Sequence, residues 1–174
     1  PVVTLVAGTD AKPNRLEYAS SNNFVLGYAE DGVGAQLVTI TADTVANTVV
    51  FNAPVLLSAL FDDDCGVVSG GVREGGVEFV AVYGGNTLLS LTAEVFSISP
   101  AGVLTSLAPG VVIYAPTTAT FAAAPQSTAR LIVEIIDYDE NVFGILQVFT
   151  QSGTSIVAAP VATTVFSGHP GLPI

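Results

Sequence analysis

The chain has 174 residues, of which 50% are hydrophobic and only 11% are charged, and its formal net charge is −11. This length suits one domain with a real core, but a typical soluble domain has about 25% charged residues. With only four basic residues, the chain would repel a polyanion, which argues against nucleic-acid binding.

The sequence also argues against membrane insertion and a disulfide scaffold. Gly, Pro, Ser and Thr interrupt every apolar stretch, and none approaches the roughly 18 to 20 residues of a membrane helix. Cys65 is the only cysteine, so no intrachain disulfide can form. No basic-then-apolar signal segment opens the chain, and Pro1 suits removal of an initiator methionine. We expect synthesis in a reducing cytoplasm, with no membrane partner; processing from a longer precursor is the alternative.

Charge is missing from long stretches of the chain. From Val95 to Ala129 the only ionisable side chain is Tyr114, and from Asn141 onward it is His169. A surface rich in Ser and Thr is one explanation. The other is burial in an assembly, because obligate interfaces are depleted in charge.

The first predicted element is an N-terminal edge strand. Residues 1–6, PVVTLV, resemble residues 54–59, PVLLSA, which follow 53 residues later. A lone extra strand of this kind would complete a sheet in the same chain or in a neighbour. The sequence therefore predicts an assembly contact in this arm, at Val2, Val3 and Leu5.

A repeat then fills the chain. Tyr28, Tyr83 and Tyr138 are spaced by 55 residues, twice in succession, and each ends a short run of apolar residues. A repeat period of this length predicts an array of similar units. We divide the single all-β domain into an arm at 1–14, repeats at 15–60, 61–115 and 116–166, and a tail at 167–174.

Each repeat predicts four antiparallel strands. The tyrosine runs at 24–28 and 79–83 are apolar on both faces, which indicates strands buried on two sides. The run 134–138 aligns with them, although Glu134 stands where the others have Phe. Acidic or amide turns follow them, and then second strands with a period of two. A third stretch begins at a recurrent proline, which suggests an edge strand. Weaker candidates precede each tyrosine strand. The second strands are predicted at 35–42, 89–98 and 144–150. The stretches that begin at proline lie at 54–55, 109–112 and 160–161. The weaker candidates before the tyrosine strands lie at 15–20, 65–70 and 119–123.

This pattern, with the stretch VVFNAPV at 49–55, resembles the propeller-type repeats of phage tail-fibre and related virion or bacterial surface proteins. The resemblance implies blade-like units of four strands. Propellers have about four to eight blades, so three repeats would need other chains to close a ring. A β-trefoil or β-prism, which closes three units within one chain, is the alternative, followed by a sandwich or jelly roll.

Few residues suggest chemistry. Asp137, Asp139 and Asn141 place oxygen ligands at alternate positions, as the start of a calcium loop does, but Val142 stands where glycine is expected. A solvated turn is the other interpretation. The three repeated tyrosines, Tyr28, Tyr83 and Tyr138, predict either a sugar-stacking platform or core packing. The remaining candidates, each without readable partners, are Cys65, His169 and the acidic run 62–64.

We therefore expect a structural protein and not an enzyme. The repeat resemblance, the charge-poor surface and the extra strand predict a component of a virus particle, such as a capsid decoration, spike or fibre module. Its partners would be further copies of this chain or other virion proteins. The alternative is a lectin-like module that binds glycans at three equivalent sites. Apart from the calcium hypothesis, no cofactor is expected.

Overall fold

All regular structure that the computed structural model describes is β. The described residues are 12–20, 22–30, 33–58, 68–72, 78–84, 90–114, 120–127, 130–137, 143–152, 155–158 and 163–167. They form fifteen strands and no helix, which confirms the predicted all-β class with antiparallel sheets. Within the same residues, no helix is long and apolar enough to span a bilayer.

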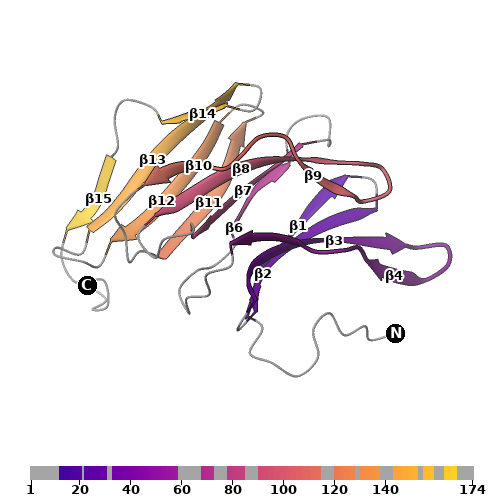
Figure 1. Ribbon diagram of the computed structural model, residues 1–174. Helices are drawn as coiled ribbons and strands as arrows, with labels where there is room; N and C mark the ends of the chain where they lie inside the picture. Colours follow the sequence, from indigo (N-terminus) through magenta and orange to yellow (C-terminus); the bar gives the residue numbers. More distant parts are fainter. Residues whose placement is uncertain are drawn as a thin grey trace.

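The strands form three sheets with one shared topology (Figure 1). Sheet 1 contains β1 Lys12–Ser20, β2 Asn23–Glu30, β3 Gly34–Asp43, β4 Thr48–Phe51 and β5 Val55–Ser58. Sheet 2 contains β6 Val68–Val72, β7 Glu78–Gly84, β8 Leu91–Ile98, β9 Leu104–Ser106 and β10 Val111–Tyr114. Sheet 3 contains β11 Thr120–Ser127, β12 Arg130–Asp137, β13 Phe143–Ser152, β14 Ser155–Ala158 and β15 Thr163–Ser167.

Each sheet has five strands because its last strand is interrupted. In sheet 1, β4 pairs with the C-terminal half of β3 and β5 with the N-terminal half. Pro54 lies in the gap between them, and Pro109 lies in the corresponding gap of sheet 2. Proline cannot donate to a strand ladder, so the break falls where the sequence predicts an edge strand.

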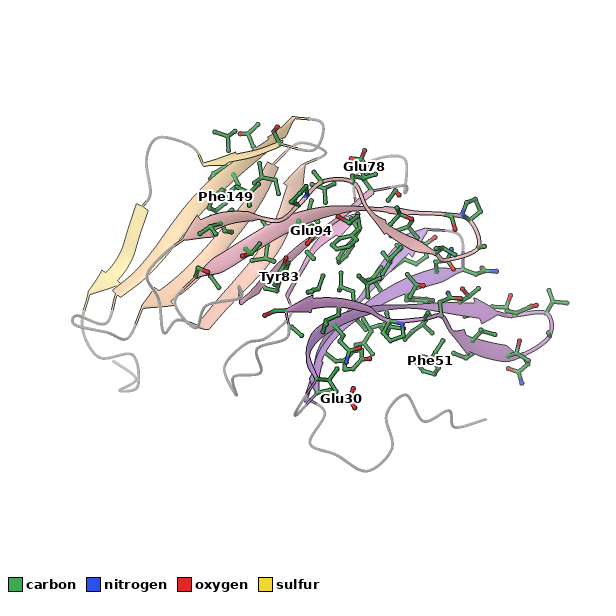
Figure 2. The ribbon with its side chains drawn as sticks, in the orientation of Figure 1. Glu30, Phe51, Glu78, Tyr83, Glu94 and Phe149 are labelled. Carbon is green, nitrogen blue, oxygen red and sulfur yellow. The ribbon has the colours of Figure 1, made fainter. Side chains whose placement is uncertain are left out.

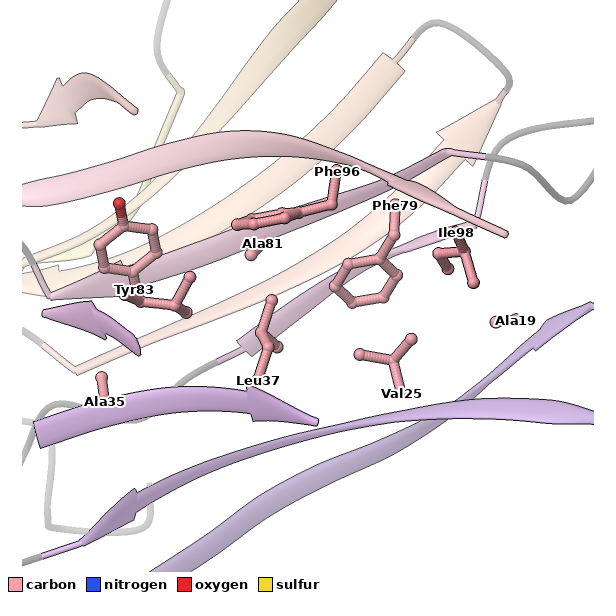
Figure 3. Packing of buried hydrophobic residues seen from close by; sticks show 10 residues of the cluster. Ala19, Val25, Ala35, Leu37, Phe79, Ala81, Tyr83, Phe96 and Ile98 are labelled. Atoms are coloured by element: carbon pink, nitrogen blue, oxygen red, sulfur yellow. The ribbon is translucent and has the colours of Figure 1, made fainter. Parts of the chain in front are cut away.

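The sheets stack as layers, with sheet 2 in the middle (Figure 1). Along β7 the side chains alternate between its two neighbours. Phe79, Ala81 and Tyr83 pack with residues of sheet 1 (Figure 3). Val80 and Val82 pack with Phe149 and other residues on the opposite side. This double burial explains why β7 is apolar on both faces.

The first strands of the sheets lie beside one another, since β6 contacts both β1 and β11. The described strands do not close further: the three sheets are open and form no ring (Figure 1). The propeller interpretation is therefore not confirmed, and the fold is established only as stacked antiparallel sheets.

The strands correct the predicted alignment of the third repeat. β2, β7 and β12 begin at Asn23, Glu78 and Arg130, which are 55 and then 52 residues apart. Tyr28 and Tyr83 are the sixth residues of their strands, but Ile135 is the sixth residue of β12. The 55-residue spacing fails because the connection at 115–119 is shorter than the one at 59–67, and connections vary more than strands do.

The stacking predicts unequal costs at two equivalent phenylalanines, both the second residues of their strands. Phe79 is fully buried between sheets, whereas Phe24 is partly exposed. We expect Phe79→Ala to lower the free energy of unfolding by about 3–5 kcal/mol. Phe24→Ala should cost about 1–2 kcal/mol, because less apolar area is lost. Urea denaturation at low protein concentration measures both, and equal losses would contradict the layered core.

Candidate interaction surface

Most of the residues singled out in the sequence lie outside the part that the structure describes. They are Val2, Val3, Leu5, Asp62, Asp63, Asp64, Cys65, Tyr138, Asp139, Asn141 and His169. Asp137 closes β12, but its side chain is not described. The predicted arm contact and calcium loop therefore stay predictions. In the described part, no cluster of three or more His, Cys, Asp or Glu side chains is placed to hold a metal ion.

The tyrosines of the first two repeats are core residues. Tyr28 and Tyr83 are both buried, so neither ring presents the open face that stacking on a sugar requires. Burial, followed by the charge of Glu30, raises the pKa of Tyr28. The two rings thus act in packing, and the third equivalent position holds Ile135.

Tyr83 also makes a polar contact inside the interface between sheets 1 and 2 (Figure 2). Its hydroxyl donates a hydrogen bond of 2.8 Å to Oε2 of Glu94 on the neighbouring strand. A Cβ at Gly110 would lie 2.5 Å from Cγ2 of Thr92 and 2.8 Å from the Tyr83 hydroxyl. The backbone at Gly110 therefore closes over this pair, and burial, the hydrogen bond and the Glu94 charge raise the pKa of Tyr83.

A polar cluster joins the turn between β8 and β9 to sheet 1. Asn23 donates to the Pro100 carbonyl at 3.2 Å, and both Thr39 and Asn52 donate to the Gly102 carbonyl. Thr41 donates to Oδ1 of Asn23 at 2.7 Å. We call these contacts the turn clasp, because they hold an otherwise exposed turn of sheet 2 on the preceding sheet.

Gly102 is required at the centre of the turn clasp. Its φ is +77°, a left-handed conformation that favours glycine. A Cβ there would lie 2.5 Å from Nδ2 of Asn52 and 2.9 Å from Oγ1 of Thr41. The close approach of the Gly102 backbone to Asn52 and Thr41 thus excludes a side chain at this position, as the positive φ also does.

The face of sheet 1 that points away from sheet 2 forms an apolar surface. Cross-strand pairs place its residues in rows: Tyr18, Phe24, Ile40 and Phe51 in one, and Leu16, Leu26 and Val38 in another. Leu56, paired with Gln36, extends it onto β5. We call this surface the outer face of sheet 1.

The outer face is open only in part, since Val38 and Tyr28 near its centre are buried while side chains on β1 and β5 are exposed. Leu16 is 55% exposed and Tyr18 is 59% exposed, with the Tyr18 ring meeting Phe24 edge-on at 5.6 Å between centroids.

The equivalent row of sheet 2 includes Phe79 and Phe96, which have no exposed area because sheet 1 covers them. The same row position is therefore covered in sheet 2 and partly open in sheet 1. The exposed apolar side chains at the two edges of this face, Leu16 and Tyr18 on β1 and Leu56 on β5, favour an interaction site there.

The sequence did hold a signal for this surface. The run 24–28 is apolar on both faces, which predicts cover on two sides. Sheet 2 covers Val25, and on the other side Tyr28 is buried while Phe24 and Leu26 stay partly exposed.

The sequence does not predict the turn clasp, because Asn23, Thr39, Thr41 and Asn52 are spread over β2, β3 and the break after β4. Their polar character alone predicts solvated positions.

Comparison of the chain with known protein families, with curated proteins and with solved structures finds no significant match.

The turn clasp predicts a large cost for Gly102→Ala. A loss of about 2–4 kcal/mol in the free energy of unfolding is expected from backbone strain together with the displaced Asn52 and Thr41 side chains. Asn47→Ala is the matched control, since Asn47 has φ 53° in the equivalent turn of sheet 1 but is exposed. It should cost about 1 kcal/mol. Chemical denaturation compares the two, and a Gly102 cost no larger than the Asn47 cost would refute the clasp.

The raised pKa of Tyr83 predicts extra loss of stability in alkali. The neutral phenol is favoured in the folded state, so its contribution is complete below the unfolded pKa of about 10 and is lost as pH rises above that value. Tyr83→Phe should lower stability by about 1 kcal/mol at pH 7. It should also flatten the decline between pH 9 and pH 11 (about one unit either side of the unfolded pKa). Urea titrations at several pH values in this range give the free energy of unfolding of the wild type and of Tyr83→Phe. Parallel plots of the two free energies against pH would contradict a raised pKa of Tyr83.

Proposed function

We propose that this protein is a structural, non-enzymatic assembly module, and that the assembly to which it belongs is a virus particle. The observation that carries the proposal is the apolar outer face of sheet 1. A surface of this composition is unfavourable in water unless a partner covers it.

The described polar groups support a structural role. Asn23, Thr39, Thr41 and Asn52 are engaged in the turn clasp. The Tyr83 hydroxyl is engaged by Glu94. These side chains hold one sheet on another, and such satisfied polar networks specify a unique packing.

The magnitude of burial supports assembly as well. Full burial of a Leu, Ile or Phe side chain is worth about 1.5–3 kcal/mol relative to exposure. Leu16, Tyr18 and Leu56 are each more than half exposed, so a partner that covered them could gain several kcal/mol before the entropy of association is subtracted.

The virus-particle setting comes from the sequence. The repeats resemble those of phage tail-fibre and virion surface proteins, and charge is absent over two long stretches. A capsid decoration, spike or fibre module fits both observations. The carbohydrate-binding alternative is less favoured, since it would use exposed aromatic rings and both described repeat tyrosines are buried.

The assembly role predicts that a charge on the outer face weakens association. Leu16→Glu should reduce self-association at least about 10-fold, because the carboxylate would have to be desolvated. The control is Val112→Glu on β10, which changes a valine that is 57% exposed. Sedimentation across a concentration series gives both constants. The proposal also expects the protein in purified virus particles by mass spectrometry. A wild-type chain that stays monomeric and is absent from virus particles would contradict the proposed assembly role.

A further inference from the structure

We infer that the free edge of β4 pairs with β4 of a second copy of this chain, so that sheet 1 continues from one copy into the other. The inference rests on the proposed assembly role and names the partner and the strand that meets it. Its basis is the direction of the backbone groups in the β3–β4 hairpin, together with exposed valines on both sides of β4.

Among the described strands, none pairs with the second edge of β4. The amide of Asn52 donates to the Thr39 carbonyl at 3.0 Å, so the backbone groups of residue 52 point toward β3. Hydrogen-bonding direction alternates along an antiparallel strand. Val50 therefore also faces β3, whereas the N–H and C=O groups of Val49 and Phe51 point to the free edge.

The neighbouring ladder agrees with this direction. Ala42 pairs with Val49, but its amide donates away from β4, to the Asn22 carbonyl at 2.8 Å. Ala42 thus does not take up the backbone groups of Val49. Figure 1 shows the hairpin projecting beyond the rest of sheet 1, which leaves its edge accessible. A row of unpaired N–H and C=O groups is a template for another strand.

Apolar side chains flank this edge on both faces of the sheet. Val49 is 39% exposed and Val50 is 54% exposed, and adjacent residues of a strand point to opposite faces. In sheet 2 the equivalent edge strand is β9, which has Thr105 at the place of Val50 by pairing register. Ser106 stands there at the place of Phe51. The edge strand of sheet 2 is therefore polar where β4 is apolar, and only the apolar edge gains from being covered.

Charge favours a second copy as the occupant. Two chains with a net charge of −11 repel each other, so they can approach closely only through uncharged surface. Residues 44–61 contain no ionisable side chain, and they include the hairpin tip, β4 and β5. The opposite edge strand, β1, contains Lys12, Arg15 and Glu17. Pairing at β4 thus joins the two copies along the uncharged edge of sheet 1.

The backbone directions select one register for a two-fold dimer. In such a dimer the outward residues Val49 and Phe51 must meet outward residues of the second copy. Val49 then pairs with Phe51 of the second copy, and the two Val50 residues face each other across the axis. Shifts of two residues would bring in Asn47, which has φ 53°, or Ala53, and both lie outside β4.

The side chains fit the same register. Phe51 pairs with Ile40 at the end of an outer-face row, and Val49 of the second copy would extend that row. The hairpin tip, Val45, is 96% exposed and would lie beside the exposed Ala53 of the second copy. A four-residue edge makes a small interface, which is typical of weak association. We therefore expect a weak dimer that further contacts on a particle reinforce.

Cysteine cross-linking tests the register. Cys65, the single native cysteine, is first changed to Ser. Val50→Cys should then form a disulfide between copies, because facing residues of a non-hydrogen-bonded antiparallel pair have Cα atoms about 4.5 Å apart, within disulfide range. Under mild oxidation its initial cross-linking rate should exceed that of Thr105→Cys, the matched change on β9, at least about 10-fold. Non-reducing gels give both rates.

Equal cross-linking rates of these two variants would overturn the inference. A mixture of Val50→Cys and Val157→Cys, both with Cys65→Ser, examines β14, the equivalent edge strand of sheet 3. A mixed disulfide that forms faster than the Val50→Cys homodimer would also overturn it, because β4 would then pair with a different edge.

Val49→Pro tests the backbone pairing. The proline removes an N–H that points to the free edge and leaves the β3–β4 bonds in place. In a Leu16→Glu parent, which weakens the outer-face contact, it should reduce dimerisation at least about 10-fold. Ser106→Pro is the matched control and should leave dimerisation unchanged, since Leu107 faces β8 and residue 106 points outward. Sedimentation gives the constants, and equal dimerisation of the two proline variants contradicts the pairing.

The Leu16→Glu parent also separates the inference from the proposed function. Leu16 lies on β1, at the opposite edge of sheet 1, so this parent should still dimerise through β4. If the wild type associates but the parent neither dimerises nor forms the Val50→Cys cross-link, the β4 pairing is wrong and the assembly role stands. If the wild type stays monomeric, is absent from virus particles and forms no cross-link, both are wrong.

Discussion

The structure depends on burial of both faces of sheet 2. Successive residues of a strand point to opposite sides, so Phe79 and Ala81 pack against sheet 1 while Val80 and Val82 pack on the other side. A shift of one residue in the pairing of β7 and β8 would exchange the two sets. Each set of side chains packs against a different neighbour, sheet 1 or sheet 3. The pairing register of sheet 2 therefore also determines which of its faces meets which neighbouring sheet.

Polar contacts then determine how the layers are aligned. Apolar faces attract each other without strong directional preference, whereas the hydrogen bonds of Asn23 and Asn52 reach particular backbone groups of one turn. Gly102 permits that approach because it has no side chain. The apolar core thus favours stacking of the two sheets, and the turn clasp favours one position of sheet 2 on sheet 1.

Repetition of this arrangement accounts for the partly exposed outer face of sheet 1. A repeat that cannot bury its surface alone uses its neighbour, and terminal repeats need a cap or a partner. Sheet 1 has the same pattern of strands as sheet 2 and no more charge on its outer rows. Phe24 and Ile40 are therefore only partly buried, where the equivalent Phe79 and Phe96 of sheet 2 are fully buried. This is the physical link between the fold and the proposed assembly.

The sequence by itself determined the strand content and the burial of strands on two sides, because alternation and β-branched residues are local properties. It also indicated the breaks at Pro54 and Pro109, since proline lacks a donor wherever it lies. Only the tertiary structure decided that Ile135 replaces Tyr138 in the repeat and that four dispersed polar residues meet one turn. Those outcomes depend on connection lengths and on contacts between distant strands, which no local pattern contains.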